Sequence, residues 1–197
     1  MVLNSFSFEP LLKEMGEVGK QLAEMGATEG AAGNLSICVR DTLEVREFFP
    51  QMSLINLPTP APDLVGATLL VTGSGRRLRD IAAAPTNNLA VIVVEDGGKT
   101  GRMFTAVKPP FRRVTSEFNS HLAVHHDQMR SRQINAHAVV HAQPKHLTFL
   151  SHIPNYQNEK YLNTRLMRWQ PETILNFPEG VGILPFLLPG SVHLMLE

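Results

Sequence analysis

The sequence predicts an α/β fold in which helices pack on a largely antiparallel β-sheet. Short apolar runs of strand length recur along the chain, and glycine-containing turns of the kind that close β-hairpins follow them. Two longer stretches instead carry apolar residues at the spacing of an amphipathic helix. Strands and helices do not alternate strictly, so a sheet built from parallel βαβ units is not expected.

The first half of the chain is predicted to contain one helix followed by strands. Residues 8–25 place seven apolar side chains on one helical face and charged side chains on the other. Compact apolar runs predict strands at 35–39, 67–71 and 89–94, and 103–107 is the expected hairpin partner of the last one. Between the first two strands the chain is rich in proline and is interpreted as turns.

The second half is predicted to alternate helices with one further strand. Thr115-Ser116-Glu117 opens a helix that carries Phe118, Leu122, His125 and Met129 on one stripe. Residues 136–140 form a strand that ends at His141, and further helices are expected at 144–150 and 158–168. An apolar segment punctuated by proline and glycine follows at 177–188.

Composition excludes several classes of protein. The 197 residues fit a single domain, and 18 basic against 18 acidic residues leave no net charge for binding nucleic acid. A lone cysteine, Cys38, rules out a disulfide framework, whereas eight histidines leave a histidine-based metal site open. No apolar run reaches the length of a membrane span and no signal peptide is recognisable, so a cytoplasmic protein is expected.

Three turns carry the residue types that bind oxyanions. They are Gly33-Asn34-Leu35-Ser36, Thr72-Gly73-Ser74-Gly75 and Thr115-Ser116. Glycine lets a ligand approach the backbone closely, and hydroxyls, an amide and free N–H groups suit a phosphate. Each turn taken alone is equally explained by ordinary turn chemistry, and Ser116 by a role as helix N-cap.

Two further groups of residues bear on chemistry. Glu117, His121 and His125 follow one another at four-residue intervals and share a helix face, where they would act beside a metal or form a polar stripe against the sheet or a partner subunit. The spacing alone favours the stripe. His141 and Gln143 point the same way from a strand end, but an amide oxygen is a weak ligand for zinc.

Taken in order, these motifs resemble the class II aldolase/adducin family. The resemblance is carried by Gly33-Asn34-Leu35-Ser36, Val71-Thr72-Gly73, Thr115-Ser116-Glu117 with His121, and the segment 134–141. The tail at 178–185, with Pro189-Gly190-Ser191, is similar to the L-rhamnulose-1-phosphate aldolase branch of that family.

The resemblance implies a three-layer αβα fold and a homotetramer with active sites at subunit interfaces. Glu117 would be the catalytic acid and base, and His141 the first ligand of a divalent metal, most often zinc in this family. Gln143 occupies the second ligand position. The implied phosphate site comprises Gly33, Asn34, Thr72, Gly73, Thr115 and Ser116.

The sequence departs from the family pattern at the metal site. Gln143 replaces the second histidine of a His-x-His pair, and the third ligand is expected well downstream of His141. His193 is the only late histidine and precedes that position, so residues 1–197 are interpreted as one family domain that lacks its C-terminal part. The alternative is a short relative with a damaged metal site.

The leading hypothesis is a metal-dependent aldolase that splits a ketose 1-phosphate, such as L-rhamnulose 1-phosphate, into dihydroxyacetone phosphate and an aldehyde. A pentulose-phosphate 4-epimerase would use the same enolate chemistry. A non-catalytic, adducin-like binding or scaffold domain would explain Gln143. A fourth reading places a metal on Glu117, His121 and His125 instead.

Overall fold

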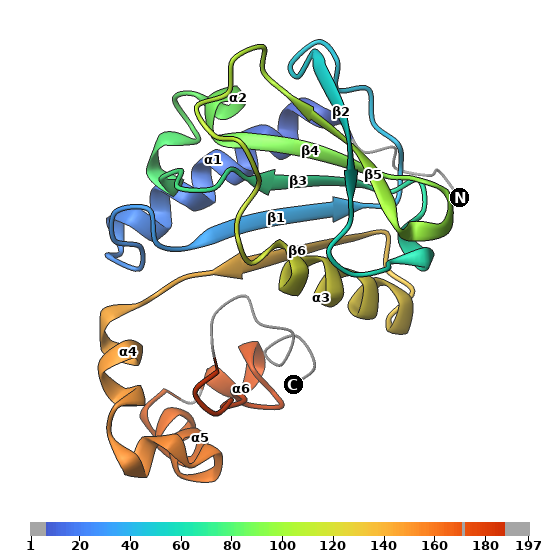
Figure 1. Cartoon of the computed structure of the whole chain (residues 1–197). Helices are drawn as coiled ribbons and strands as arrows, with labels where there is room; N and C mark the ends of the chain where they lie inside the picture. The colour runs from blue at the N-terminus through green and yellow to red at the C-terminus, as the bar shows by residue number, and fades with distance from the viewer. Residues whose placement is uncertain (1–6, 171, 188–197) are drawn as a thin grey trace.

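The computed structural model describes residues 7–170 and 172–187 and contains one six-stranded sheet (Figure 1). The strand order is β2-β5-β4-β3-β1-β6, and every neighbouring pair is antiparallel. The strands are β1 (Asn34–Val39), β2 (Gln51–Asn56), β3 (Thr68–Thr72), β4 (Leu89–Val94), β5 (Thr100–Thr105) and β6 (Ala136–His141). The antiparallel sheet predicted from the hairpin signals is therefore confirmed.

Helices cover both faces of this sheet, which confirms the three-layer αβα arrangement (Figure 1). The helices are α1 (Phe8–Glu24), α2 (Pro85–Asn88), α3 (Phe118–Ser131), α4 (Lys145–Ser151), α5 (Glu159–Trp169) and α6 (Thr173–Asn176). Short 3₁₀ turns occur at η1 (Pro62–Leu64), η2 (Leu78–Asp80), η3 (Asp96–Gly98) and η4 (Pro154–Gln157).

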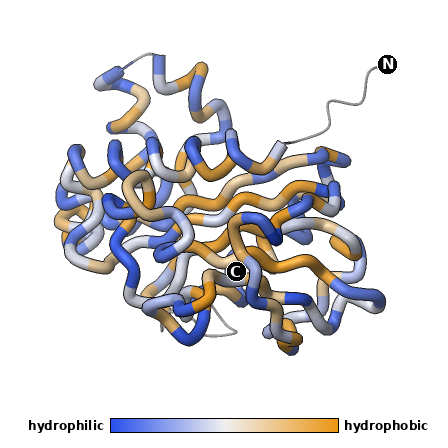
Figure 2. The backbone as a smooth tube through the Cα atoms, turned by 90° about the horizontal axis from the view of Figure 1, so that it is seen from above, coloured by the Kyte–Doolittle hydropathy of each residue, from blue (hydrophilic) through white to orange (hydrophobic). Residues whose placement is uncertain are grey.

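The core is divided into two layers by the alternation of side chains along the strands. On β3 and β4, Leu70 and Val91 pack with α1, whereas Leu69, Val71 and Ile92 pack with α3. Both strands are buried along their whole length, and the sheet interior is accordingly the most apolar part of the chain (Figure 2). This explains why β4 is a continuous apolar run and why β3 is apolar between its two terminal threonines.

Strand β2 corrects a prediction, because its sequence is typical of turns and the structure has a strand there. Its side chains are almost all exposed, because it lies at the edge of the sheet and pairs only with β5. An exposed edge strand has no buried face to produce an apolar alternation. The partner strand β5 also begins three residues earlier than the predicted start at 103, since Thr100 already pairs with Asn56.

The segment 145–187 forms small helices set apart from the sheet (Figure 1). Of its described residues only Leu162 is buried, and large apolar side chains such as Phe149, Trp169 and Phe186 are exposed. His193 and the tail beyond residue 187 lie outside the described residues. Within the described part of the chain, no helix is both long and apolar enough to cross a membrane.

Candidate active site

The candidate site lies at the edge of the sheet where β1 begins and β3 and β6 end. Because β1 is antiparallel to both neighbours, its first residues lie beside the last residues of each. Asn34 is directly opposite His141, and Ser36 is opposite Val71. The first and the fourth sequence motifs, more than a hundred residues apart, meet here for that reason.

The segment that precedes α3 is held against the end of β3 and brings in the third motif. Gly73 forms an isolated bridge with Val114, and the Thr115 N–H donates to the Thr72 carbonyl at 2.9 Å. Glu117 then occupies the N-cap position of α3, so the helix begins one residue later than predicted. Ser116 is not the N-cap, which leaves its exposed side chain at the site.

These elements enclose a small polar cavity of about 160 Å³. Eight of the nine residues predicted for the site line it, together with residues of the adjoining turns. The lining residues are Ala31, Ala32, Gly33, Asn34, Gly73, Ser74, Gly75, Arg76, Thr115, Ser116, Glu117, His141 and Gln143. Thr72 is the exception, because it is buried and its hydroxyl bonds to the backbone of Leu35.

A carboxylate and an imidazole meet in this cavity. Glu117 Oε2 lies 2.6 Å from His141 Nδ1 and accepts a hydrogen bond of 3.1 Å from Asn34 Nδ2. The two side chains are 18% and 33% exposed, so both remain accessible to a ligand. A carboxylate that is partly desolvated and held by two donors can accept and return a proton at one fixed place.

Two positions in the cavity wall require glycine, because neighbouring atoms lie too close for a side chain. Gly33 has a φ of +84°, and a Cβ there would meet the His141 carbonyl oxygen at 2.8 Å. A Cβ on Gly73 would lie 2.4 Å from Cδ1 of the Phe111 ring. Any side chain at either position would push apart the elements that form the cavity.

Arg76 is the one lysine or arginine among the residues that line this cavity, and it was not among the predicted site residues. Its Nε donates to Asn88 Oδ1 at 3.0 Å, which fixes the side chain beside the Gly73–Gly75 turn. A single arginine after a turn forms no recognisable pattern. The only indication in the sequence is that Arg76 immediately follows the turn Thr72-Gly73-Ser74-Gly75, which was predicted to bind an anion.

His121 and His125 do not line the cavity but pack against the sheet, as the spacing favoured. They are 2% and 0% exposed, and the Ser36 hydroxyl lies 2.6 Å from His121 Nδ1 and 2.7 Å from His125 Nε2. Burial is the main cause that lowers the pKa of His121 to about 4 and that of His125 to about 3. Both rings are therefore neutral at physiological pH.

This arrangement does not support the hypothesis that Glu117, His121 and His125 bind a metal. Both ring nitrogens of each histidine already have hydrogen-bond partners, so neither ring has a free nitrogen for a metal. Among the described residues, no group of three or more histidine, cysteine, aspartate or glutamate side chains is placed to hold an ion.

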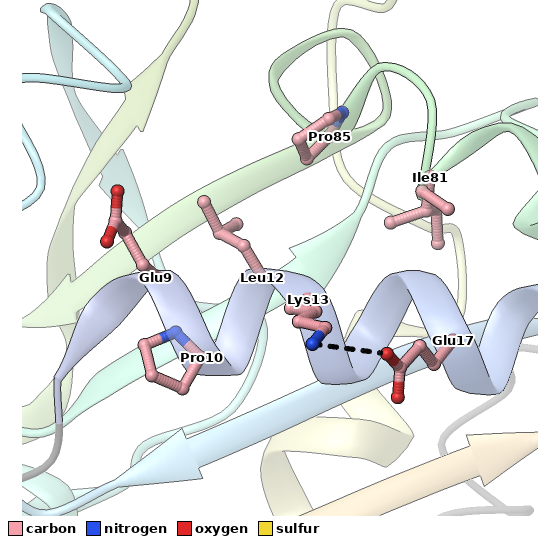
Figure 3. Close-up of a pocket in the computed structure, with 8 residues that line it drawn as sticks. Glu9, Pro10, Leu12, Lys13, Glu17, Ile81 and Pro85 are labelled. Carbon is pink, nitrogen blue, oxygen red and sulfur yellow. Dashed lines mark ion pairs between the residues drawn. The ribbon is translucent and has the colours of Figure 1, made fainter.

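A larger groove of about 720 Å³ lies between α1 and residues 81–85 (Figure 3). Its lining is mainly apolar and includes Leu12, Ile81 and Pro85. Its charged residues include Lys13 and Glu17, which pair with each other at 3.8 Å and are well exposed. None of the predicted site residues lines this groove.

Comparison with known proteins places this architecture in a family. The model described as Class II Aldolase and Adducin N-terminal domain matches residues 13–195. The chain belongs to this family. Its fold and the order of its motifs are thus those that the resemblance implied.

Individual relatives agree with the family assignment. The rhamnulose-1-phosphate aldolase of Bacteroides thetaiotaomicron is 30% identical over 187 residues, which cover 93% of this chain and 67% of the relative. The Yersinia pestis (strain Pestoides F) enzyme of that name is 27% identical over 195 residues, covering 96% of this chain and 68% of its own.

Solved structures have the same architecture. The crystal structure of a sugar-phosphate aldolase from Thermotoga maritima matches with a TM-score of 0.75 and 28% identity, covering 95% of this chain and 75% of that one. The Escherichia coli protein YgbL matches with a TM-score of 0.56 over 95% of this chain, and at 20% identity it shows the fold alone.

Proposed function

We propose that this class II aldolase family member is a lyase that cleaves a ketose 1-phosphate, such as L-rhamnulose 1-phosphate, to dihydroxyacetone phosphate and an aldehyde. The observation that carries the proposal is the Glu117–His141 contact of 2.6 Å inside a cavity walled by glycine turns and hydroxyls. The names of the relatives at 27–30% identity and of the Thermotoga maritima structure support the same reaction class.

The phosphate would be held by the turns that line the cavity. Gly33 and Gly73 leave their backbone open to close approach, while Asn34, Thr115 and Ser116 supply polar side chains. Arg76 adds the positive charge that a phosphate dianion needs in a partly buried place. Thr72 acts indirectly, because its carbonyl accepts the Thr115 N–H and so positions that residue.

Glu117 would carry the proton. When the bond between C3 and C4 of the ketose breaks, its electron pair stays on the dihydroxyacetone phosphate half as an enediolate, while the C4 hydroxyl gives its proton to the ionised Glu117 carboxylate and becomes the aldehyde. A proton must then be delivered to C3 of the enediolate. The Glu117 carboxyl lies in the cavity wall with its orientation fixed by Asn34 and His141, which suits it to that delivery.

The class generally depends on a divalent metal, but the described residues fit one only in part. With Nδ1 donating to Glu117, a neutral His141 ring has its lone pair on Nε2. Gln143 also lines the cavity but offers only an amide oxygen, a weak donor for zinc. Catalytic zinc sites usually have about three protein ligands, so His141 and Gln143 alone do not complete one.

The proposal is tested by Glu117→Gln, with Glu47→Gln as the control because Glu47 is an exposed carboxylate outside the cavity. Cleavage of L-rhamnulose 1-phosphate is followed by release of dihydroxyacetone phosphate. Glu117→Gln should lose about a hundredfold or more in kcat, because the amide cannot transfer the proton, while circular dichroism stays unchanged. Full activity in Glu117→Gln would remove this residue from the mechanism.

A non-catalytic binding domain is the second candidate, and the observation in its favour is Gln143 at the second ligand position. Elemental analysis of the purified chain and of Gln143→His separates the two. Stoichiometric metal that is retained by the natural chain, or gained by Gln143→His together with activity, supports the lyase. Absence of both metal and turnover in each protein supports the binding domain.

The resemblance also implies a homotetramer, which we carry forward as a proposal. The exposed apolar side chains of segment 145–187, among them Phe149, Trp169 and Phe186, provide surface that an assembly would bury. Light scattering coupled to size-exclusion chromatography measures the mass directly. A chain that stays monomeric at micromolar concentration would contradict this part of the proposal.

A further inference from the structure

A row of hydrogen-bonded side chains runs from the cavity into the layer between the sheet and α3. Asn34 and Ser36 share one face of β1, His121 and His125 are one turn apart on α3, and His137 lies on β6. The first four residues of this row are at most 8% exposed. Each is in contact with the next, so the row links Glu117 to a strand position far from the cavity.

When Glu117 is ionised, the hydrogen atoms of this row have only one consistent arrangement. Glu117 is an acceptor when ionised, so the atom of Asn34 at 3.1 Å must be the amide nitrogen. The amide oxygen of Asn34 then faces His121 Nε2, which must donate to it. A neutral His121 ring therefore has a bare Nδ1, which accepts the Ser36 hydroxyl hydrogen at 2.6 Å.

The same reasoning continues along the row. Since the Ser36 hydrogen is used on His121, its oxygen accepts from His125 Nε2 at 2.7 Å. His125 Nδ1 is then bare and accepts from His137 Nδ1 at 2.9 Å. The lowered pKa values of His121 and His125, caused mainly by burial, keep both rings neutral as this arrangement requires. Every donor points toward Glu117.

We propose that Ser36, His121, His125 and His137 are positioning residues that fix the amide of Asn34 with its nitrogen on Glu117. If the amide turned over, its oxygen would face the Glu117 carboxylate and two acceptors would repel each other. His121 prevents this by donating to the amide oxygen. The row thus holds the catalytic carboxylate in one orientation, an inference that rests on the function proposed above.

The row does not conduct protons to Glu117. A chain of imidazoles and hydroxyls can pass protons by exchanging donor and acceptor roles, but Asn34 stands between His121 and Glu117. The amide nitrogen does not give up a proton and take another under these conditions. The row therefore orients the Asn34 amide and Glu117. Its specific signature is that every hydrogen-bond donor points toward Glu117.

The first test reads the tautomers directly in the chain of 197 residues. Nitrogen NMR of the histidine side chains should show hydrogen on Nε2 of both His121 and His125, and on Nδ1 of His137. Hydrogen on Nδ1 of His121 or His125 would overturn the proposal. This measurement needs no activity, so Nε2 tautomers in a chain without aldolase activity would support the row while the proposed function failed.

The second test uses Ser36→Ala, with Thr68→Val as the matched control. Both changes remove a buried hydroxyl from the sheet, but Thr68 bonds only to the backbone of Asp41 and Leu43. We expect Ser36→Ala to lower kcat about tenfold, with KM changed less than twofold. Ser36→Thr, which restores a hydroxyl, should recover most of the loss.

A purely structural role for Ser36 would give a different pattern. Ser36→Ala and Thr68→Val would then lose similar stability in urea unfolding and keep similar kcat values. That result would overturn the proposal even if both proteins were folded. Loss of kcat in Ser36→Ala alone, at matched stability, supports it.

Discussion

Acid should destabilise this protein through its buried histidines, and His125 has the more strongly lowered pKa of the two in the core. The ring is completely buried, and burial, followed by the nearby His137 and His121, lowers its pKa from 6.5 to about 3. In the unfolded chain the ring has its ordinary pKa of about 6.5 and binds a proton below that pH. The unfolded state therefore binds more protons between pH 6.5 and about 3, and stability falls as the pH falls through this window.

The size of this effect follows from the difference between the pKa of His125 in the unfolded chain, about 6.5, and the pH of the measurement. At pH 5 the gap is about 1.5 pH units, and at about 1.4 kcal/mol per unit the neutral ring of His125 costs about 2 kcal/mol. At pH 7 the cost is close to zero. For a chain of this length the loss corresponds to about 4–8 °C in Tm.

Urea unfolding at pH 7 and pH 5 measures the contribution of His125 when the natural chain is compared with His125→Gln. The variant keeps a donor for Ser36 but has no titrating ring, so its loss of stability between the two pH values should be smaller by about 2 kcal/mol. His146→Gln, which removes an exposed ring, should behave like the natural chain. An unchanged pH dependence in His125→Gln would refute the reasoning.

Three further predictions follow from packing. Gly19→Ala should destabilise the chain by about 1–3 kcal/mol in urea unfolding, although alanine favours helices, because its Cβ would lie 2.4 Å from the Leu78 carbonyl oxygen. Gly73→Ala should cost a similar amount and also lower turnover, because its Cβ would meet the Phe111 ring at the cavity wall. Cys38 should resist thiol reagents at pH 8 until the chain unfolds, because burial raises its pKa to about 12.

Each of these predictions has a simple control. Gly182→Ala places its Cβ in open space and should leave the free energy of unfolding unchanged. A stability of Gly19→Ala or Gly73→Ala equal to that of Gly182→Ala would show that the neighbouring elements adjust without cost. For Cys38, complete labelling in urea shows that the thiol is intact, and rapid labelling of the native chain would contradict its burial.

Much of the fold could be predicted because buried strands have a strong sequence signal. Strand β4 is apolar throughout and β3 is apolar between its terminal threonines, so both were predicted, and α1 was predicted from its apolar face. The exposed strand β2 was missed because pairing at a sheet edge depends on backbone hydrogen bonds, which any sequence can form. Its position is set by β5 rather than by its own side chains.

The candidate site was predictable in its members but not in its connections. The motifs named Glu117, His141 and the turns that line the cavity, since small polar residues at strand ends are conspicuous. Arg76 was missed, because no pattern marks a lone cation. His137 was likewise not recognised as a partner of His125, since that contact depends on how α3 crosses β6.

The alternation of side chains on β1 also guards the assembly of the site against misfolding. Moving this strand by one residue relative to its neighbours would turn Asn34 and Ser36 toward α1, and would place Leu35 and Ile37 among the histidines of α3. Such a molecule would bury polar groups among apolar side chains and leave imidazoles without hydrogen-bond partners. It would therefore be less stable than the native fold. In a correctly folded molecule, Asn34 and Ser36 therefore already face the histidines of α3.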